Sequence, residues 1–260
     1  VFLNKKFSCS IEEKSEKDFL ADSGLQRSLF EDNERKSLIL VSNVSDKLIN
    51  CLDQIGEGIY IFTSEKAEGS KAAGDWGGLV ICGLAPINIA GGHAELEGGY
   101  GAYFGGNTPT DNSGILKYVR VEYAGIPINP NQEINSFTFG GVGNGTTLSY
   151  LQASYGGDDS FEWFGGTVNA DHLIAYRGVD DDFDTDNGYS GHIQFGLGIR
   201  DKNIADFGPS GASNGFESDN DAAGSAFSPK TSARFYNITQ IGAFRCSGNA
   251  GPLVRSEERR

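Results

Sequence analysis

The chain has 260 residues, 37 of them glycine, and a formal net charge of −14. Residues 150–225 hold 14 acids against only Arg177, Arg200 and Lys202. An acidic surface of this size disfavours nucleic acids and anionic membranes as partners, and no apolar run is long enough to span a membrane. The hydrophobic content of 38% is that of a globular protein.

In chain order, three regions differ in composition. Residues 1–57 carry dense mixed charge and a loosely helical spacing of apolar side chains, which predicts an atypical lead-in that is helical or poorly ordered. Residues 58–243 consist of short β-branched and aromatic runs closed by glycine or asparagine, such as GIYIFTS, GGLVICG and ILKYVRVEYAG. Residues 244–260 lose this pattern and are expected to form a tail. The pattern therefore predicts one all-β domain over 58–243.

An acidic-aromatic phrase returns three times within that domain with its positions in step. The offsets between successive phenylalanines are 22 and 33 residues, which is the range of a coiled or stacked architecture. The residue after each phenylalanine is acidic. The copies are DDSFEWFGG at 158–166, DDDFDTDNG at 180–188 and GFESDND at 215–221, aligned on Phe161, Phe183 and Phe216.

These copies decide between two all-β architectures. A sandwich or barrel needs antiparallel hairpins, whereas a parallel β-helix places like residues over like in successive rungs. The alignment favours the parallel β-helix. Its coil should be right-handed, because parallel crossovers are almost always right-handed. Phe137 extends the phenylalanine column by one rung, and Tyr123, Tyr155 and Tyr176 are expected to form a second column. Phenylalanines should then stack inside and carboxylates outside, about 4.8 Å apart.

The stacked carboxylates form a candidate metal site. Strand alternation would place the acids of the FDTD segment on one face at intervals of roughly 6.6 Å, with acids of neighbouring rungs beside them. Such a grid either binds a cation, with calcium the ion expected for oxygen ligands, or is a solvated acidic face. The candidate ligands are Glu162, Asp182, Asp184, Asp186, Glu217 and Asp219.

Aromatic side chains near the acids and in a glycine-rich loop are candidate glycan contacts. The segment 91–114 is long and mostly without strand character, and such loops over a regular scaffold often carry recognition. Aromatic rings there could stack on sugar rings. The candidate ligand-binding residues are Trp76, Tyr100, Tyr103, Phe104, Trp163 and Tyr189.

An enzyme remains the alternative. Paired carboxylates could hydrolyse glycosidic bonds, and a lyase would add calcium and a basic residue such as Arg177. The acidic region has few basic residues to hold a polyanionic substrate, and the chain shows no serine-hydrolase or phosphate-loop pattern. No residue is therefore assigned a catalytic role.

Residues 59–242 resemble a family of right-handed parallel β-helix proteins of Bacteroidetes, often lipoproteins or type IX-secreted. The similarity is carried by GDWGGLVICGLAPIN, LKYVRVEYAG, GGVGNGTT, the stretch from SYGGDDSFEWFGG to GYSGHIQFG, and GFESDNDAAGS. The resemblance implies a β-helix fold and a cell-surface or extracellular location, although no signal-peptide pattern is visible. It implies no reaction.

Together these observations predict a non-catalytic surface or secreted β-helix. Its expected role is glycan binding, adhesion or structural display, with glycans or surface proteins as partners and calcium as the one cofactor considered. The alternative is a calcium-assisted polysaccharide lyase or glycoside hydrolase.

Overall fold

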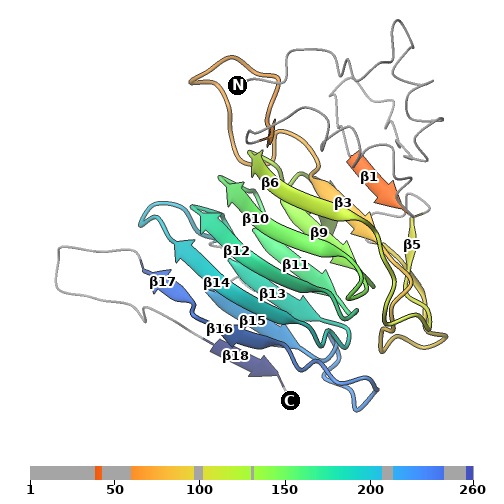
Figure 1. The fold of residues 1–260 in the computed structure, drawn as a ribbon. Coiled ribbons are helices and arrows are strands. Elements are labelled where there is room, and N and C mark those ends of the chain that lie inside the picture. The colour runs from red at the N-terminus through yellow and green to blue at the C-terminus, as the bar shows by residue number, and fades with distance from the viewer. Residues whose placement is uncertain are drawn as a thin grey trace, which may run out of the picture.

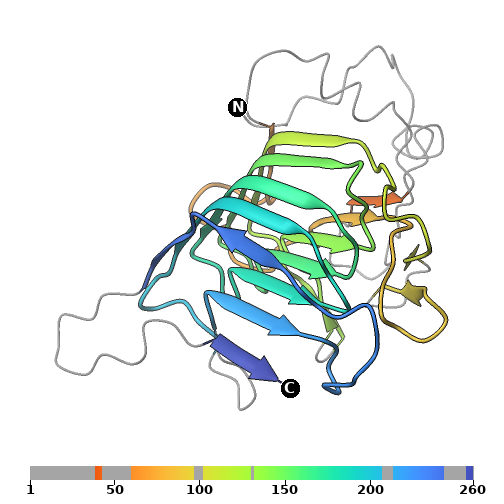
Figure 2. The same ribbon diagram turned by 60° about the horizontal axis from the view of Figure 1, so that its bottom comes forward.

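A computed structural model describes residues 39–42, 60–96, 102–129, 132–206, 213–242 and 256–259. Two parallel β-sheets face each other and share one core (Figures 1 and 2). The predicted all-β parallel β-helix is confirmed. Most of the expected lead-in and tail lies outside the described residues. Among the residues that the structure describes, no helix is long and apolar enough to span a membrane.

The first sheet, sheet A, carries the phenylalanine column. All of its neighbouring strands pair in parallel, and each strand is four residues long. In spatial order its strands are β1 (Ile39–Ser42), β3 (Leu79–Cys82), β9 (Phe137–Gly140), β11 (Phe161–Phe164), β13 (Phe183–Asp186), β15 (Phe216–Asp219) and β18 (Ser256–Arg259).

The second sheet, sheet B, contains the longer strands, and the chain alternates between the two sheets from β9 to β16. One strand of each sheet therefore forms one coil of the helix. The strands of sheet B are β16 (Arg234–Tyr236), β14 (His192–Ile199), β12 (Asn169–Tyr176), β10 (Thr147–Ser154), β6 (Ile115–Glu122) and β2 (Tyr60–Phe62), with β17 (Thr239–Ile241) also paired to β14.

The core between the sheets is built on stacked rings. Phe161 lies fully buried between Phe137 and Phe183, with ring centroids 5.0 and 5.8 Å away. Phe216 continues the column at 5.5 Å from Phe183. Parallel rings at this spacing add stacking energy to the burial of apolar area. The phenylalanine column predicted from the repeat is thus confirmed.

The second predicted column is wrong by one residue on its third rung. Tyr123 and Tyr155 do stack, with ring centroids 5.1 Å apart. Ser154, however, pairs with Tyr176, so Arg177 occupies the position that follows Tyr155. Paired residues of β10 and β12 are therefore 22 residues apart in the chain, rather than the predicted 21. Tyr123, Tyr155 and Arg177 all have φ near +60°, which marks a shared corner of the coil.

Two short hairpins stand outside the coil. The first joins β4 (Ala94–Glu95) to β5 (Tyr103–Phe104), and the second joins β7 (Pro127–Asn129) to β8 (Gln132–Glu133). The β4–β5 hairpin forms a small second core on the outer face of sheet A, where Phe104 contacts Phe164. The described parts of segment 91–114 are therefore packed against the scaffold rather than extended from it.

Candidate functional site

The carboxylates of the repeat lie on the outer face of sheet A, opposite the phenylalanines. The strand register aligns Glu162 with Asp184 and Asp184 with Glu217, as the repeat predicted. On the preceding strand, β9, Thr138 pairs with Glu162 and occupies the same column. Glu162 is only 9% exposed and Asp184 is half-buried. This part of the face is therefore not the solvated acidic surface that the sequence offered as one of two alternatives.

A second polar column lies at the corner where the chain enters sheet A, two residues before each phenylalanine. Oδ1 of Asp159 accepts a hydrogen bond from the backbone N of Asp181 at 2.8 Å, and Oδ1 of Asp181 accepts one from the backbone N of Asn214. Each carboxylate thus ties its rung to the next. Sequence analysis missed this column, although its signal is visible: N-x-F or D-x-F at 135–137, 159–161, 181–183 and 214–216.

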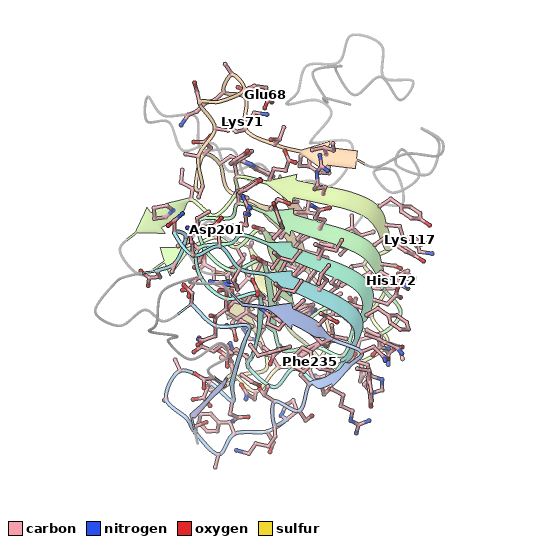
Figure 3. The ribbon with its side chains drawn as sticks, turned by 90° about the vertical axis from the view of Figure 1, so that its left-hand side faces the viewer. Glu68, Lys71, Lys117, His172, Asp201 and Phe235 are labelled. Atoms are coloured by element: carbon pink, nitrogen blue, oxygen red, sulfur yellow. The ribbon has the colours of Figure 1, made fainter. Side chains whose placement is uncertain are left out.

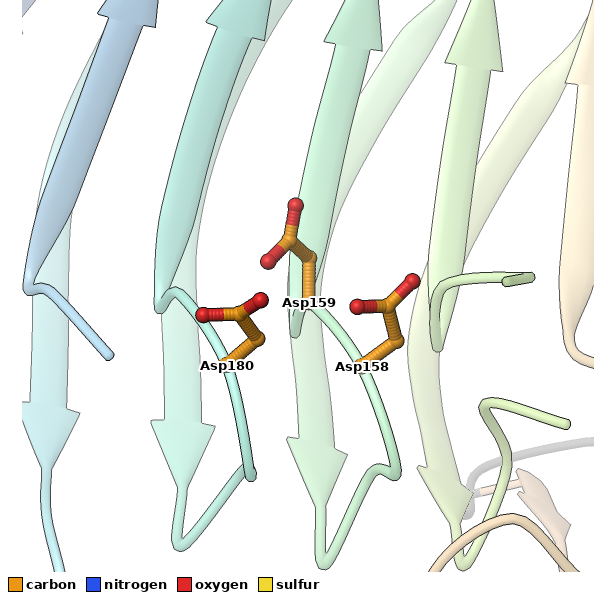
Figure 4. A group of neighbouring side chains, drawn as sticks. All are labelled: Asp158, Asp159 and Asp180. Carbon is orange, nitrogen blue, oxygen red and sulfur yellow. The ribbon is translucent and has the colours of Figure 1, made fainter. Parts of the chain in front are cut away.

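The two columns converge on a candidate cation site. One carboxylate oxygen each from Asp159, Glu162 and Asp184 lie within 4.8 Å of one another. A second group, Asp158, Asp159 and Asp180, satisfies the same limit at the corner (Figure 4). Ca²⁺ binds oxygens at about 2.3–2.6 Å, so oxygens this close can share one ion. We call Asp159, Glu162 and Asp184 the acidic site; it could hold a metal ion.

Neighbouring polar atoms also suit a cation. Asn135 is 3% exposed, and its Nδ2 donates to Oε2 of Glu162 and, at 3.3 Å, to Oγ1 of Thr138. Its Oδ1 is buried with no hydrogen-bond partner, and the same holds for Oδ1 of Asp184. An unmatched buried acceptor costs about 1–3 kcal/mol. Amide and carboxylate oxygens of this kind are the ligands that hard cations take.

Burial and mutual repulsion raise the pKa of these acids. Desolvation, reinforced by the charge of Asp158, raises the pKa of Asp159 well above its ordinary value. Desolvation and the charge of Glu217 do the same for Asp184. Burial raises the pKa of Asp181 to about 9 and that of Asp186 to about 7. Near neutral pH the site must therefore either keep protons or bind a cation.

The predicted metal ligands do not all share one face. Asp184 and Asp186 are both half-buried on the outer face of β13, but Asp182 precedes the strand and is fully buried. It accepts a hydrogen bond from Arg200 at 2.9 Å and another from Gln240, so its place on the metal-binding face is corrected. Glu217 and Asp219 lie half-buried on the neighbouring strand β15.

Most of the predicted glycan contacts are buried. Trp163 and Tyr189 are fully buried, with ring centroids 5.5 Å apart, and the Tyr189 hydroxyl donates to the carbonyl of Val168. Nε1 of Trp76, also buried, donates to the carbonyl of Glu122 at 2.8 Å. Placing these three rings on a sugar-stacking surface was wrong because the coil needs them as core.

The remaining two predicted contacts lie on the β4–β5 hairpin, and Tyr100 lies outside the described residues. Phe104 is 4% exposed because it packs on Phe164 and over Gly140, so it too belongs to a core. Tyr103 is 60% exposed and stays available for contact.

The arginines near the acids are both held in ion pairs. Nε of Arg177 lies 3.4 Å from Oδ2 of Asp201, and its guanidinium lies over the ring of Tyr176. Arg200 is largely buried and also donates to the carbonyls of Asp180 and Val179. Both arginines are thus engaged with groups other than Asp159, Glu162 and Asp184, so they do not supply the base that a lyase needs there.

Comparison with known proteins agrees with this architecture. Residues 42–256 match the protein family described as the pectate-lyase-like β-helix domain. The match starts and ends further out than the resemblance over residues 59–242 indicated. No curated protein and no solved structure matches the chain. Since the family match covers most of the chain and the fold agrees, this protein belongs to the pectate-lyase-like β-helix domain family.

Proposed function

We propose that this protein is a non-catalytic β-helix that binds Ca²⁺ at the acidic site. The observation that carries the proposal is the approach of three carboxylates, from Asp159, Glu162 and Asp184, to within 4.8 Å in a largely buried setting. Without a counterion, like charges at that distance repel strongly in a low-dielectric environment. A divalent cation removes the repulsion and links two successive rungs of sheet A.

Calcium fits this donor set better than the other common ions. The donors are carboxylate oxygens, and Ca²⁺ takes six to eight oxygens in a flexible geometry. Zinc favours nitrogen and sulfur ligands. Magnesium demands near-octahedral geometry and retains water. The partly open side of Asp184 leaves space for water to complete a calcium shell.

The biological role that we propose is adhesion, structural display or glycan binding outside the cell. Extracellular modules bind calcium with a Kd of about 10⁻⁴–10⁻³ M, which suits a site with few ligands. The resemblance to exported β-helix proteins supports the location. Under this proposal calcium stiffens the coil, and the ligand is bound elsewhere on the surface.

Cleavage of an acidic polysaccharide is the second candidate, and family membership favours it. The ion pairs of Arg177 and Arg200 weigh against it, since a lyase needs a free base beside the cation. Incubation with polygalacturonate and calcium separates the two, with the absorbance of unsaturated products reporting a lyase and new reducing ends reporting a hydrolase. Turnover would replace the non-catalytic proposal.

The calcium site is tested by thermal unfolding in CaCl₂ and in EDTA, together with elemental analysis of the dialysed protein. We expect calcium to raise the Tm by several degrees, since a ligand at 100 times its Kd contributes about 2.7 kcal/mol. Glu162→Gln and Asp184→Asn should abolish the shift. Glu122→Gln, which alters a carboxylate paired with Arg120 on sheet B, should retain it. An equal shift in all four proteins would contradict the assignment.

A further inference from the structure

The outer face of sheet B carries a column of exposed rings, one on each of four successive strands. The ring centroids are 4.8 Å apart between Tyr118 and Tyr150, 4.3 Å between Tyr150 and His172, and 4.9 Å between His172 and Phe195. Tyr118, Tyr150 and Phe195 are each 44–48% exposed. We call these four residues the aromatic ridge. Exposed apolar surface gathered in this way marks an interaction site more often than scattered residues do.

The backbone of every ridge residue is in the left-handed region. The φ values are 57° at Tyr118, 55° at Tyr150, 54° at His172 and 59° at Phe195. A non-glycine residue in this conformation costs on the order of 1–3 kcal/mol, and such strain clusters at functional sites. The same conformation recurs at one register on four strands and holds the four rings in one column.

The left-handed residue also breaks the alternation of the strand, so the side chain before each ring faces outward as well. This produces a polar column beside the ridge: Lys117, Ser149, Asp171 and Gln194. Ser149 is only 4% exposed, and its hydroxyl donates to Asp171. Lys117 and His172 project from the same face in Figure 3. The face thus offers rings and hydrogen-bonding groups in two adjacent rows along the axis of the coil.

The carboxylates on this face are held in contacts with their neighbours. Asp171 lies 2.5 Å from both Ser149 Oγ and His172 Nδ1, and Arg120 pairs with Glu122 at 2.8 Å. The whole chain carries a net charge of −14, which repels anionic chains at long range. A neutral ligand meets no such repulsion, and it matches a face whose carboxylates are already paired.

The size of the face indicates a narrow ligand. Four strands of eight residues span roughly 20 Å by 26 Å, or about 500 Å². A stable protein–protein interface buries about 800 Å² on each partner. The face is therefore small for a second copy of the chain, whereas the long, straight ridge suits a linear molecule that lies along it.

We propose that the aromatic ridge binds a neutral linear polysaccharide. Because each ring stacks on the next, the ligand meets ring edges and the hydroxyls of Tyr118 and Tyr150 rather than ring faces. Sugar hydroxyls bond to the tyrosine hydroxyls and to Gln194, and the exposed ring edges add van der Waals contact. The inference deepens the glycan-binding part of the proposed function and is independent of the cation site.

Affinity electrophoresis tests it with hydroxyethyl cellulose and glucomannan as neutral probes and polygalacturonate as the anionic probe. At least one neutral probe should retard the full chain, in EDTA as well as in CaCl₂. Tyr150→Asn removes one of the two inner rings, and asparagine tolerates a left-handed backbone. This substitution should raise the apparent Kd about tenfold. Phe195→Asn gives a second measurement at the end of the ridge.

Tyr123→Asn is the matched control. Tyr123 has a φ of 61° and stacks on Tyr155, but it lies at the corner of the coil and not on the ridge, so its loss should leave retardation unchanged. Thermal unfolding of each variant verifies the fold. Any of four results would overturn the proposal: no retardation by either neutral probe, retardation by polygalacturonate alone, loss of retardation in EDTA, or self-association that Tyr150→Asn abolishes.

Discussion

At the scale of single residues, stability rests on rings stacked from rung to rung. Phe183 is fully buried and touches the rings of Phe161, Phe216 and Phe235. Phe183→Ala removes these contacts and leaves a cavity that the regular coil cannot easily close. We expect a loss of about 3–5 kcal/mol in the free energy of unfolding, measured by denaturant titration. Phe227→Ala, at an exposed ring, should cost less than about 0.5 kcal/mol; equal losses would refute the internal column.

Two aspartates of one acidic run have different roles. Asp182 and Asp184 are two positions apart in one acidic run, yet Asp182 pairs with Arg200 in the interior while Asp184 faces the acidic site. The repeat alone predicted that Asp184 would stack with Glu162, because both follow a core phenylalanine. The partner of Asp182, Arg200, directly follows β14 and lies 18 residues away in the chain, so no local sequence pattern predicts this pair.

At the scale of elements, the corners of the coil set how closely successive rungs approach. Gly125 has a φ of +95°, and a Cβ there would lie 2.5 Å from the backbone N of Gly157 on the next rung. Gly125→Ala combines backbone strain with a clash against backbone that cannot move aside. We expect destabilisation well above about 1 kcal/mol by thermal or chemical unfolding.

Gly69→Ala provides the control for that prediction. Gly69 also has a positive φ, +82°, but a Cβ there would meet nothing within 4 Å. Its substitution therefore reports backbone strain alone. If the two variants lost the same stability, the close packing of the corners would contribute nothing, and the argument from rung spacing would fail.

At the scale of the whole molecule, the buried acids link stability to pH. The pKa of Asp181 is about 9 and that of Asp186 about 7, against roughly 3.9 in an unfolded chain. The native state therefore binds more protons than the unfolded state above about pH 4. The free energy of unfolding should fall as pH rises through about 7 for Asp186 and about 9 for Asp181.

Thermal unfolding in EDTA between about pH 5 and pH 8 measures this slope. We expect the Tm to decrease with rising pH, and added calcium to restore it most at the upper end. Asp186→Asn should flatten the slope below about pH 7. Asp221→Asn should not flatten it, because hydrogen bonds from Ser225 lower the pKa of Asp221 and its titration has the opposite sign. A Tm that rises with pH in EDTA would contradict the burial of the acids.

The amino-acid sequence was sufficient to predict the parallel architecture and the phenylalanine column of its core. Phenylalanine recurs at matching positions with an acid after it, and only parallel stacking makes such a repeat useful, because like residues then lie over like. That periodicity predicted the core column and the alignment of Glu162, Asp184 and Glu217. It could not show that Trp163 and Tyr189 also belong to the core, because aromatic residues occur both in protein interiors and at ligand-binding surfaces.

Tertiary structure alone decided the geometry of the surface. Asp159 joins the acidic site because the corner column and the outward column meet there, and their approach depends on the path of the chain between sheets. The aromatic ridge depends on a left-handed residue in each of the four eight-residue strands of sheet B, where two neighbouring side chains then turn outward. Alternation is a property of regular strands, so a sequence pattern that assumes it cannot reveal where the backbone departs from it.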